Sequence, residues 1–292
     1  MDRQSEITAQ TRLLGLLGHP VEHSFSPVFQ NAALRYFHLP MVYVAFDVLP
    51  DNLSFAIMSI RSLGILGFNV TVPHKERILP FLDQQEGPAR ILKAVNTVVN
   101  EHGRLTGYNT DVIGFTATLE KHQVNLDQKH CVVLGAGGAA KAVLYVLFQK
   151  KVKHITLVNR TPNRLFPVKE WFQKSFRAHL DIENWENFQN GSSDFINSAD
   201  IIINTTSLGL RGEEVPLPWG NLQKCEWVID VVYHPGGTPL VNEAQRCGIP
   251  AFDGKTMLLY QGAESFFLFT GQKAPVSVME EAMNQAITLK IP

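Results

Sequence analysis

Polar residues that could bind a small molecule stand at expected strand ends and strand–helix loops, mostly in the first third of the chain. They carry hydroxyl, carboxamide or charged side chains beside apolar segments: Ser24, Ser26, Asn69, Thr71, Lys75, Asn96, Asp111 and, near the other end, Gln261. Such a set suits a small polyhydroxylated substrate held by several directional hydrogen bonds in a concave site. Each residue also has a simpler interpretation, because serine caps helices, asparagine fixes turns and lysine is usually solvated.

Proton transfer is the chemistry that Lys75 and Asp111 could supply. Reduction of a ketone needs an acid at the carbonyl oxygen, and the reverse reaction needs a base. Lys75 can serve if its ammonium group is held near that oxygen, and Asp111 can orient the ammonium and bond a neighbouring hydroxyl. His74 is the rival acid, but neighbours on an extended segment point in opposite directions. We therefore favour Lys75 and expect His74 to lie outside the site.

A glycine-rich turn between an apolar strand and an apolar helix predicts a dinucleotide site. Residues 135–140 read Gly-Ala-Gly-Gly-Ala-Ala and fit the pattern G-x-G-x-x-A. Gly135 permits the sharp turn, Gly137 lets the backbone approach a pyrophosphate, and Ala140 keeps helix and strand close. The following helix offers free N–H groups and its positive dipole end to the phosphates.

The residues after the next strand, 155–158, indicate which dinucleotide is bound. An acidic residue there would favour NAD, but the segment from Asn159 to Arg164 contains no acid and carries two arginines, Arg160 and Arg164. Two guanidinium groups suit a ribose 2′-phosphate. We therefore expect NADP.

Alternating apolar and polar segments predict two α/β domains with a cleft between them, Lys75 on one wall and Gly137 on the other. Residues 1–113 form an α/β substrate domain with a mostly parallel sheet, completed by helices in residues 250–292. Residues 114–249 form a Rossmann-type, doubly wound NADP domain. First-domain strands are expected at 13–18, 41–48, 66–72, 94–100 and 104–108, and helices at 26–37, 53–63 and 112–121.

In the second domain, a helix should follow Arg164, with Pro167 either restarting it or sitting in its first turn. Strands are expected at 200–204 and 227–232. Ligands of open α/β sheets bind outside the carboxyl ends of the strands, so the polar loop that starts at Thr205 and the segment at Tyr233 should face a ligand.

Bulk composition limits the remaining classes. The 292 residues are 45% hydrophobic and 18% charged, with a net charge of -1, so nothing draws the chain to nucleic acid or an anionic membrane. Three scattered cysteines suggest neither a disulfide framework nor a metal site. Residues 131–148 are nearly all apolar, but their glycines and Lys141 argue against a membrane span. The polar first twelve residues do not read as a signal peptide, so a cytoplasmic protein is expected. The oligomeric state stays open, and a homodimer is one allowed state.

Together the motifs resemble those of the shikimate/quinate dehydrogenase family, from about Leu14 to Gly271. The first motifs are Gly18-x-Pro20-x-x-His23-Ser24-x-Ser26-Pro27, Asn69-Val70-Thr71-x-Pro73-x-Lys75, Ala94-x-Asn96-Thr97 and Gly107-x-Asn109-Thr110-Asp111. The later ones are Gly135-Ala136-Gly137-Gly138-Ala139, Asn159-Arg160-Thr161, Asp230-x-x-Tyr233-x-Pro235 and Gly254-x-x-Met257-Leu258-x-x-Gln261. Two departures, Gln30 in place of a common histidine and Leu210 in place of methionine, touch no catalytic role.

The resemblance implies NADPH-dependent reduction of 3-dehydroshikimate to shikimate, in aromatic amino-acid biosynthesis, with Lys75 and Asp111 as the catalytic pair. Ser24 and Ser26 would hold the substrate carboxylate. The ring would contact Asn69, Thr71, Lys75, Asn96, Asp111 and Gln261, with Tyr233 lining the substrate side. The cofactor would contact Gly135, Ala136, Gly137, Gly138, Ala139, Asn159, Arg160, Thr161, Arg164, Thr205, Val231 and Gly254.

Three alternatives stay open. One is a quinate/shikimate dehydrogenase with relaxed cofactor use, against which the basic loop argues. Another is a non-catalytic regulator that senses shikimate or quinate, although a sensor has no need of both Lys75 and Asp111. The third is another two-domain dehydrogenase, of the folate type. The paired serines Ser24 and Ser26 argue against it, because they fit a carboxylated, sugar-like ring better.

Overall fold

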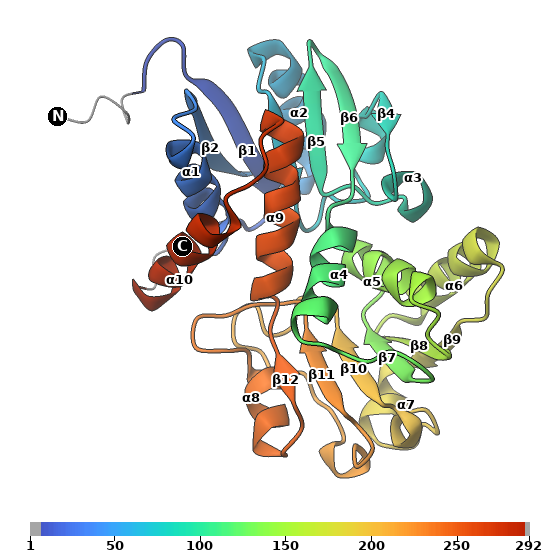
Figure 1. Cartoon of the computed structure of the whole chain (residues 1–292). Coiled ribbons are helices and arrows are strands. Elements are labelled where there is room, and N and C mark those ends of the chain that lie inside the picture. Colours follow the sequence, from blue (N-terminus) through green and yellow to red (C-terminus); the bar gives the residue numbers. More distant parts are fainter. Residues whose placement is uncertain (1–6, 290–292) are drawn as a thin grey trace. The chain divides into compact units, whose positions relative to one another are not determined.

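Two compact α/β units make up the computed structural model, which describes residues 7–289. One unit contains the described residues up to Gly114 and those from Leu258 onward, and the other is Phe115–Met257. Each unit is built on its own six-stranded sheet, and the elements are labelled in Figure 1.

The sheet of the first unit is mixed, with the strand order β2-β1-β3-β5-β6-β4. Its strands are β1 (Arg12–Gly18), β2 (Met41–Asp47), β3 (Gly67–Val70), β4 (Gln84–Gln85), β5 (Thr97–Glu101) and β6 (Arg104–Tyr108). β1 pairs in parallel with β2 and β3, whereas β5 runs antiparallel to both β3 and β6. The predicted βαβαβ start and the following hairpin are confirmed.

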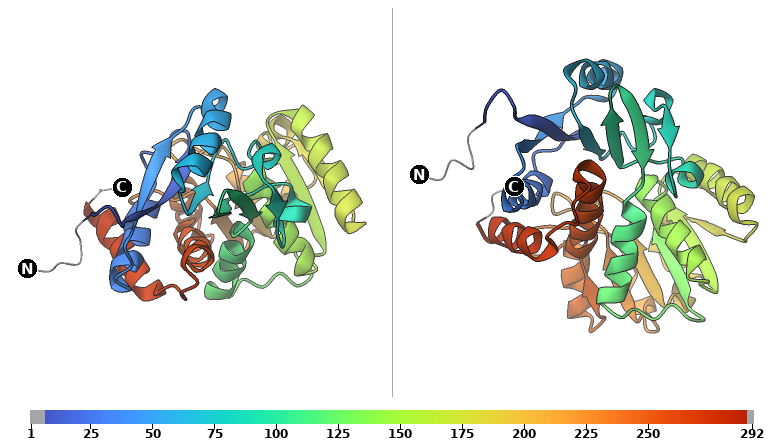
Figure 2. Two further views of the ribbon diagram at one scale, coloured as in Figure 1. Left: turned by 90° about the horizontal axis from the view of Figure 1, so that it is seen from above. Right: turned by 45° about the horizontal axis from the view of Figure 1, so that its top comes forward.

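Helices cover this sheet and return to it from the end of the chain. They are α1 (Ser26–Tyr36), α2 (Leu53–Leu63), α3 (Ala89–Leu92), the start of α4 (Asp111–Lys121), most of α9 (Lys255–Thr270), and α10 (Val276–Leu289), with short 3-10 turns at Pro50–Asn52 and Leu79–Phe81. Ile57 and Ile60 of α2 pack on Phe68 and Val98 of the sheet in one apolar cluster. α10 packs against α1 (Figure 2).

All strands of the second unit are parallel, in the order β12-β11-β10-β7-β8-β9, which is the Rossmann-like arrangement predicted. The strands are β7 (His130–Leu134), β8 (His154–Asn159), β9 (Asp181–Asn184), β10 (Ile201–Asn204), β11 (Trp227–Asp230) and β12 (Ala251–Phe252). β7 and β10 are buried at every position, because helices cover both faces of a parallel sheet. Leu134, Asn204 and Asp230 are register partners, so these three strands end at one edge.

The helices of the second unit differ from the prediction at one proline. They are α5 (Gly138–Gln149), α6 (Pro162–Phe176), α7 (Trp185–Gln189) and α8 (Pro239–Arg246), with 3-10 turns at Ile196–Ser198 and Trp219–Asn221. α6 begins at Pro162, so Pro167 lies inside the helix and neither restarts it nor sits in its first turn. Pro167 is exposed, and water can bond the carbonyl that lacks its usual donor.

The end of β3 and the start of α1 also differ from the prediction. β3 stops at Val70, and the next residues form a turn in which the His74 N–H donates to the Thr71 carbonyl at 2.8 Å. Ser26, considered as a helix cap, makes no capping bond, because Phe25 holds the N-cap position. Among residues 7–289, no helix has both the length and the apolar character needed to cross a bilayer.

Candidate active site

Lys75 and Asp111 form an ion pair in the first unit. Lys75 Nζ lies 2.6 Å from Asp111 Oδ2, and the two side chains are only 17% and 5% exposed. Asp111 opens α4, and Lys75 leaves the turn after β3, where its carbonyl accepts the Val95 N–H at 2.8 Å. A short, charge-assisted hydrogen bond of this kind fixes the ammonium group in one position.

Asn96 holds the other oxygen of Asp111. The Asn96 Oδ1 atom accepts the backbone N–H of Thr110 at 2.7 Å, so its Nδ2 atom must face the opposite way. Nδ2 then donates to Asp111 Oδ1 at 2.8 Å. Because each carboxylate oxygen of Asp111 has its own donor, the carboxylate is held in one orientation. The carboxylate in turn fixes the direction of the Lys75 ammonium group.

A buried hydrogen-bond network continues from this pair into the core. Asn69 Oδ1 accepts from the Tyr43 hydroxyl at 2.8 Å, and Asn69 Nδ2 donates to Thr97 Oγ1 at 2.9 Å and to Ser265 Oγ at 2.8 Å. Burial raises the pKa of Tyr43, which keeps its phenol a neutral donor. Thr97 Oγ1 also lies 3.3 Å from Thr110 Oγ1, which joins this network to Asn96. Both polar atoms of Asn69 thus have protein partners, as do those of Asn96, and the two carboxamides tie the strand ends together.

The late helix α9 brings Gln261 into the same cluster. Gln261 Oε1 lies 3.3 Å from Asn96 Nδ2 and 3.4 Å from Thr110 Oγ1. One helical turn later, Ser265 Oγ lies 2.8 Å from Thr97 Oγ1. The Gln261 carboxamide and the Ser265 hydroxyl, four residues apart, thus lie on one face of α9. Their hydrogen bonds hold α9 against the ends of the first-unit strands.

Tyr43, Thr97, Thr110 and Ser265 were missed by the sequence reasoning. Two of them carried a signal, since Thr97 and Thr110 stand next to Asn96 and Asp111 in the quoted motifs. Ser265 could have been found from its helical spacing to Gln261. Tyr43 lies in a strand and gives no sequence sign of its buried partner.

Ser24, Ser26 and Thr71 lie where two loops meet beside β1. Ser24 Oγ accepts the Ser26 N–H at 3.2 Å, and Ser26 is the first residue of α1. A Cβ atom on Gly18 would lie 2.2 Å from Thr71 Cγ2, so only glycine lets the two loops approach this closely. With no side-chain cap at α1, the two hydroxyls and the positive helix end suit a carboxylate.

His74, the rival acid, is held away from Lys75. It is buried, its Nε2 atom lies 2.7 Å from the Val48 carbonyl oxygen, and burial lowers its pKa. Residues 72–78 form a turn and not the extended segment that was predicted. The His74 and Lys75 side chains are therefore separated by their hydrogen-bond partners, Val48 and Asp111, and not by strand alternation.

In the second unit, the glycine turn and α5 fit a dinucleotide phosphate. Gly135 has φ +105°, and a Cβ on it would also lie 2.8 Å from Thr205 Oγ1. A Cβ on Gly137 would meet nothing within 4 Å, so the space above the turn is open. α5 starts without a side-chain cap or an acidic residue in its first turn, which leaves its N–H groups for an anion. Ala136 is half-buried in the turn, Gly138 and Ala139 are half-buried in the first turn of α5, and Ala140 behind them is fully buried.

Two exposed arginines stand at the start of α6. The Arg164 N–H donates to the Thr161 carbonyl at 3.0 Å, but within the described residues neither guanidinium group, of Arg160 or of Arg164, has a hydrogen bond or an ion pair. Asn159 Nδ2 donates to the Thr161 carbonyl at 2.9 Å and shapes the loop before the helix. Both guanidinium groups can therefore bind a phosphate without breaking an existing pair.

The other predicted cofactor residues border the same sheet edge. Thr205 Oγ1 donates to the Leu134 carbonyl at 2.7 Å, and the Val231 N–H donates to the Asn204 carbonyl at 3.0 Å. A Cβ on Gly254 would lie 2.1 Å from the Val231 carbonyl oxygen, so the two segments touch. Tyr233, predicted on the substrate side, is half-buried in the segment that follows β11. No group of three or more potential metal ligands occurs in the part of the chain that is described.

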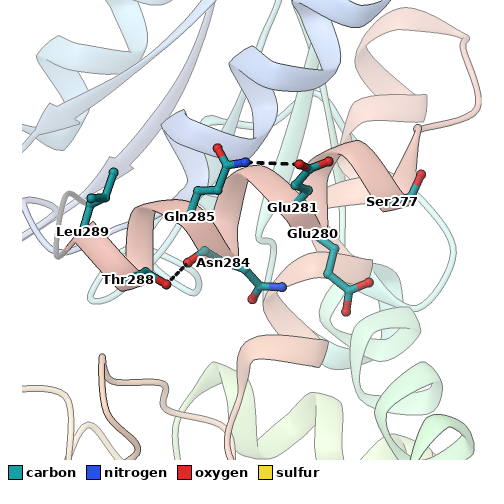
Figure 3. A pocket seen from close by; sticks show the side chains of 7 residues that line it. All are labelled: Ser277, Glu280, Glu281, Asn284, Gln285, Thr288 and Leu289. Atoms are coloured by element: carbon teal, nitrogen blue, oxygen red, sulfur yellow. Dashed lines mark hydrogen bonds between the residues drawn. The ribbon is translucent and has the colours of Figure 1, made fainter.

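A surface hollow of about 740 Å³ lies along α10 and is distinct from these residues (Figure 3). It is lined by Ser277, Glu280, Glu281, Asn284, Gln285, Thr288 and Leu289. Gln285 bonds Glu281, and Thr288 bonds the Asn284 carbonyl, within the same helix. It contains none of the predicted site residues, so we do not assign it to the site.

Three family descriptions match successive parts of the chain. Residues 16–98 match a shikimate dehydrogenase substrate binding domain, and residues 117–209 match shikimate/quinate 5-dehydrogenase. Residues 254–283 match a shikimate 5'-dehydrogenase C-terminal domain. The matches include the segments that hold Lys75, the glycine turn and Gln261.

Similar proteins cover nearly the whole chain. The shikimate dehydrogenase (NADP(+)) of Moorella thermoacetica is 43% identical over 97% of this chain and 96% of its own. A crystal structure of shikimate dehydrogenase in complex with NADP+ is 38% identical, with a TM-score of 0.86 over 97% of this chain and 98% of that chain. The Thermus thermophilus enzyme, crystallised with NADP(H) and shikimate, is 34% identical, with a TM-score of 0.81 over 94% of this chain and 99% of that chain. A quinate dehydrogenase from Corynebacterium glutamicum in complex with NAD is 30% identical, with a TM-score of 0.82 over 94% and 99%.

Proposed function

We propose, on the premise that the chain belongs to the shikimate/quinate dehydrogenase family, that it reversibly reduces 3-dehydroshikimate to shikimate with NADPH. Full-length relatives of this activity support the proposal. The observation that carries it is the 2.6 Å ion pair of Lys75 and Asp111, fixed by Asn96. A regulator that only sensed the ligand would have no use for a proton-transfer group held in this way.

Lys75 is the acid/base residue of this proposal. Bound NADPH supplies the hydride, and the protein must deliver one proton to the carbonyl oxygen. Lys75 Nζ donates that proton in reduction and takes it back in oxidation. Because the Lys75 side chain is 17% exposed, its ammonium can exchange protons with solvent between turnovers. Asp111 holds the ammonium and keeps lone pairs for a ring hydroxyl.

The substrate is held around this pair by neutral hydrogen-bonding groups. Ser24 and Ser26 bind its carboxylate at the start of α1, and Thr71, which lies against Gly18 at the end of β1, contacts the ring. Asn96, from the segment between α3 and β5, and Gln261, from helix α9, present their carboxamides. The carboxylate is therefore bound at one end of the substrate and the ring hydroxyls at the other.

The cofactor is held by the second unit. The glycine turn and α5 bind the pyrophosphate, and Arg160 and Arg164 bind the 2′-phosphate with Asn159 and Thr161 beside them. Val231, Gly254 and Thr205 border the nicotinamide end. The free guanidinium groups are the reason for preferring NADP over NAD. Three reduced cysteines, two of them buried, favour a cytoplasmic location.

Initial rates with shikimate and quinate, each with NADP+ and NAD+, test this proposal against its neighbours. We expect shikimate with NADP+ to give the highest kcat/KM. Likeness to a quinate dehydrogenase that binds NAD makes quinate with NAD+ the informative contrast. A higher kcat/KM for that combination would replace the proposal, and no turnover with either acid would leave only a binding function.

A further inference from the structure

Asp230 ends β11 with a buried carboxyl group that has no cationic partner among the described residues. The residue is 1% exposed, and the charged group that acts on it is another acid, Asp253. Asp253 is itself paired with Lys255, Nζ to Oδ2, at 3.1 Å. Burial of such a carboxyl costs free energy, and an apolar side chain at this strand end would avoid that cost. The carboxyl is therefore expected to do something that an apolar side chain cannot.

Its contacts join two loops. Asp230 Oδ1 accepts from Asn204 Nδ2 at 2.9 Å and from the Val232 N–H at 3.0 Å. Asn204 in turn orders the loop after β10, because its Oδ1 accepts the Thr206 N–H at 3.0 Å and its Nδ2 donates to the Leu208 carbonyl at 3.2 Å. One carboxyl oxygen thus ties the end of β10 to the segment that follows β11.

Each of these two bonds flanks a residue assigned to the cofactor. Thr205 follows Asn204 directly and packs against Gly135 of the glycine turn. Val231 lies between Asp230 and Val232 and contacts Gly254. Fixing Asn204 and Val232 therefore fixes the backbone on which Thr205 and Val231 stand.

We propose that Asp230 is a positioning residue of the cofactor site, which holds the loops of Thr205 and Val231 in the arrangement that binds NADP. This inference rests on the proposed function only where it takes those two residues as cofactor contacts. Burial raises the pKa of Asp230 to about 7, and Oδ1 can accept both bonds in either protonation state. A carboxamide in the same place can also accept both bonds, whereas an apolar side chain cannot.

The dissociation constant of NADP+, measured by titration of the full-length protein without turnover, distinguishes an acceptor from an apolar side chain at this position. We expect Asp230→Leu to bind NADP+ at least tenfold more weakly and Asp230→Asn to bind within about threefold of the unchanged protein. The KM for shikimate at saturating NADP+ should change less than twofold in both. The control is Asp200→Leu, because Asp200 Oδ2 accepts the His130 N–H at 2.7 Å just before β10, at the other end of the strand.

NADP+ binding by Asp230→Leu within twofold of the unchanged protein would overturn the inference. An equal loss in Asp200→Leu would overturn it too, because that would show a general loss of packing. Should Asp230→Leu not fold, Asn204→Ala removes one of the two bonds, and tenfold weaker binding is again expected; unchanged binding refutes the inference. A protein that binds NADP+ as expected but does not oxidise shikimate would instead refute only the proposed function.

Discussion

Asp111 receives one hydrogen bond on each carboxylate oxygen, and this arrangement makes it sensitive to the smallest substitution. In Asp111→Asn, the new amide nitrogen would face either Lys75 or Asn96, both of which are donors. We expect kcat/KM for shikimate to fall by about tenfold to a hundredfold, the worth of a charged hydrogen bond. Steady-state rates check this, with Asp83→Asn as the control, because that carboxylate pairs with Arg61 at an exposed surface.

Asp230 should give the protein a distinctive dependence of stability on pH. Its pKa rises from 3.8 to about 7 on folding, so the folded state binds its proton more tightly than the unfolded state does. The contribution is complete below about pH 4 and is lost as the pH rises through 7, up to about 4 kcal/mol. Urea unfolding at pH 5.5 and 8.5 should show a smaller loss for Asp230→Asn than for the unchanged protein. Equal losses would contradict the assignment, and Asp200→Asn controls for the loss of a half-buried carboxylate elsewhere in the same unit.

At the residue scale, the pairing of Lys75 with Asp111 could be predicted, but its supports could not. The two residues stood out because few side chains move protons, and their part in catalysis stays a prediction. Tyr43 and Ser265 were not, because nothing in a tyrosine within a strand or a serine within an apolar helix shows that its hydroxyl has a buried partner 26 or 168 residues away. Such partners are set by tertiary packing alone.

At the element scale, we propose that the start of α6 determines the choice of cofactor. Arg160→Ala should weaken NADP+ binding by about tenfold to a hundredfold and leave NAD+ binding nearly unchanged, because it removes a charged hydrogen bond to a phosphate that NAD+ lacks. Dissociation constants for both nucleotides measure this. Arg177, exposed at the other end of α6, is the control. Equal loss for both nucleotides would show that Arg160 acts through the fold.

The segment between β12 and α9 is fitted against β11 without room for a side chain. A Cβ on Gly254 would lie 2.1 Å from one backbone atom of Val231 and 2.6 Å from another, so Gly254→Ala must push the two segments apart. We expect a loss of about 1–3 kcal/mol in stability, as for other overpacked sites, together with weaker NADP+ binding. Thermal unfolding checks the first, with Gly220→Ala as the control, because a Cβ there meets nothing within 4 Å. A melting temperature equal to that of the control would contradict the prediction.

Long, strongly apolar elements were predictable, and short or polar ones were not. β7 and β10 are continuous buried runs, so their type and place could be read directly. β9 reads Asp-Ile-Glu-Asn and is only half-buried, because it lies at the edge of its sheet, and no apolar pattern marks it. Pro167 was misjudged because the earlier Pro162, with Thr161 before it, already provides the start of α6.

At the scale of the whole molecule, each unit holds one half of the proposed site on its own sheet. The Lys75–Asp111 ion pair and its hydrogen-bond network lie in the first unit, although α9 comes from the far end of the chain. The glycine turn, the basic loop and the Asp230 contacts use only second-unit residues. Variants of Arg160 or Asp230 should therefore alter nucleotide affinity, whereas variants of Lys75 should alter the chemical step.

The most direct test is the rate of that step in a single turnover. Protein in excess over NADP+ is mixed with saturating shikimate, and NADPH formation is followed for the unchanged protein, Lys75→Ala and His74→Ala. We predict a rate lower by roughly 10²–10⁴ for Lys75→Ala, the range for loss of a general acid/base, in a variant that remains folded. His74→Ala should stay within a few fold. A near-normal rate in Lys75→Ala with an abolished rate in His74→Ala would show that the proton moves through His74 and would contradict the account.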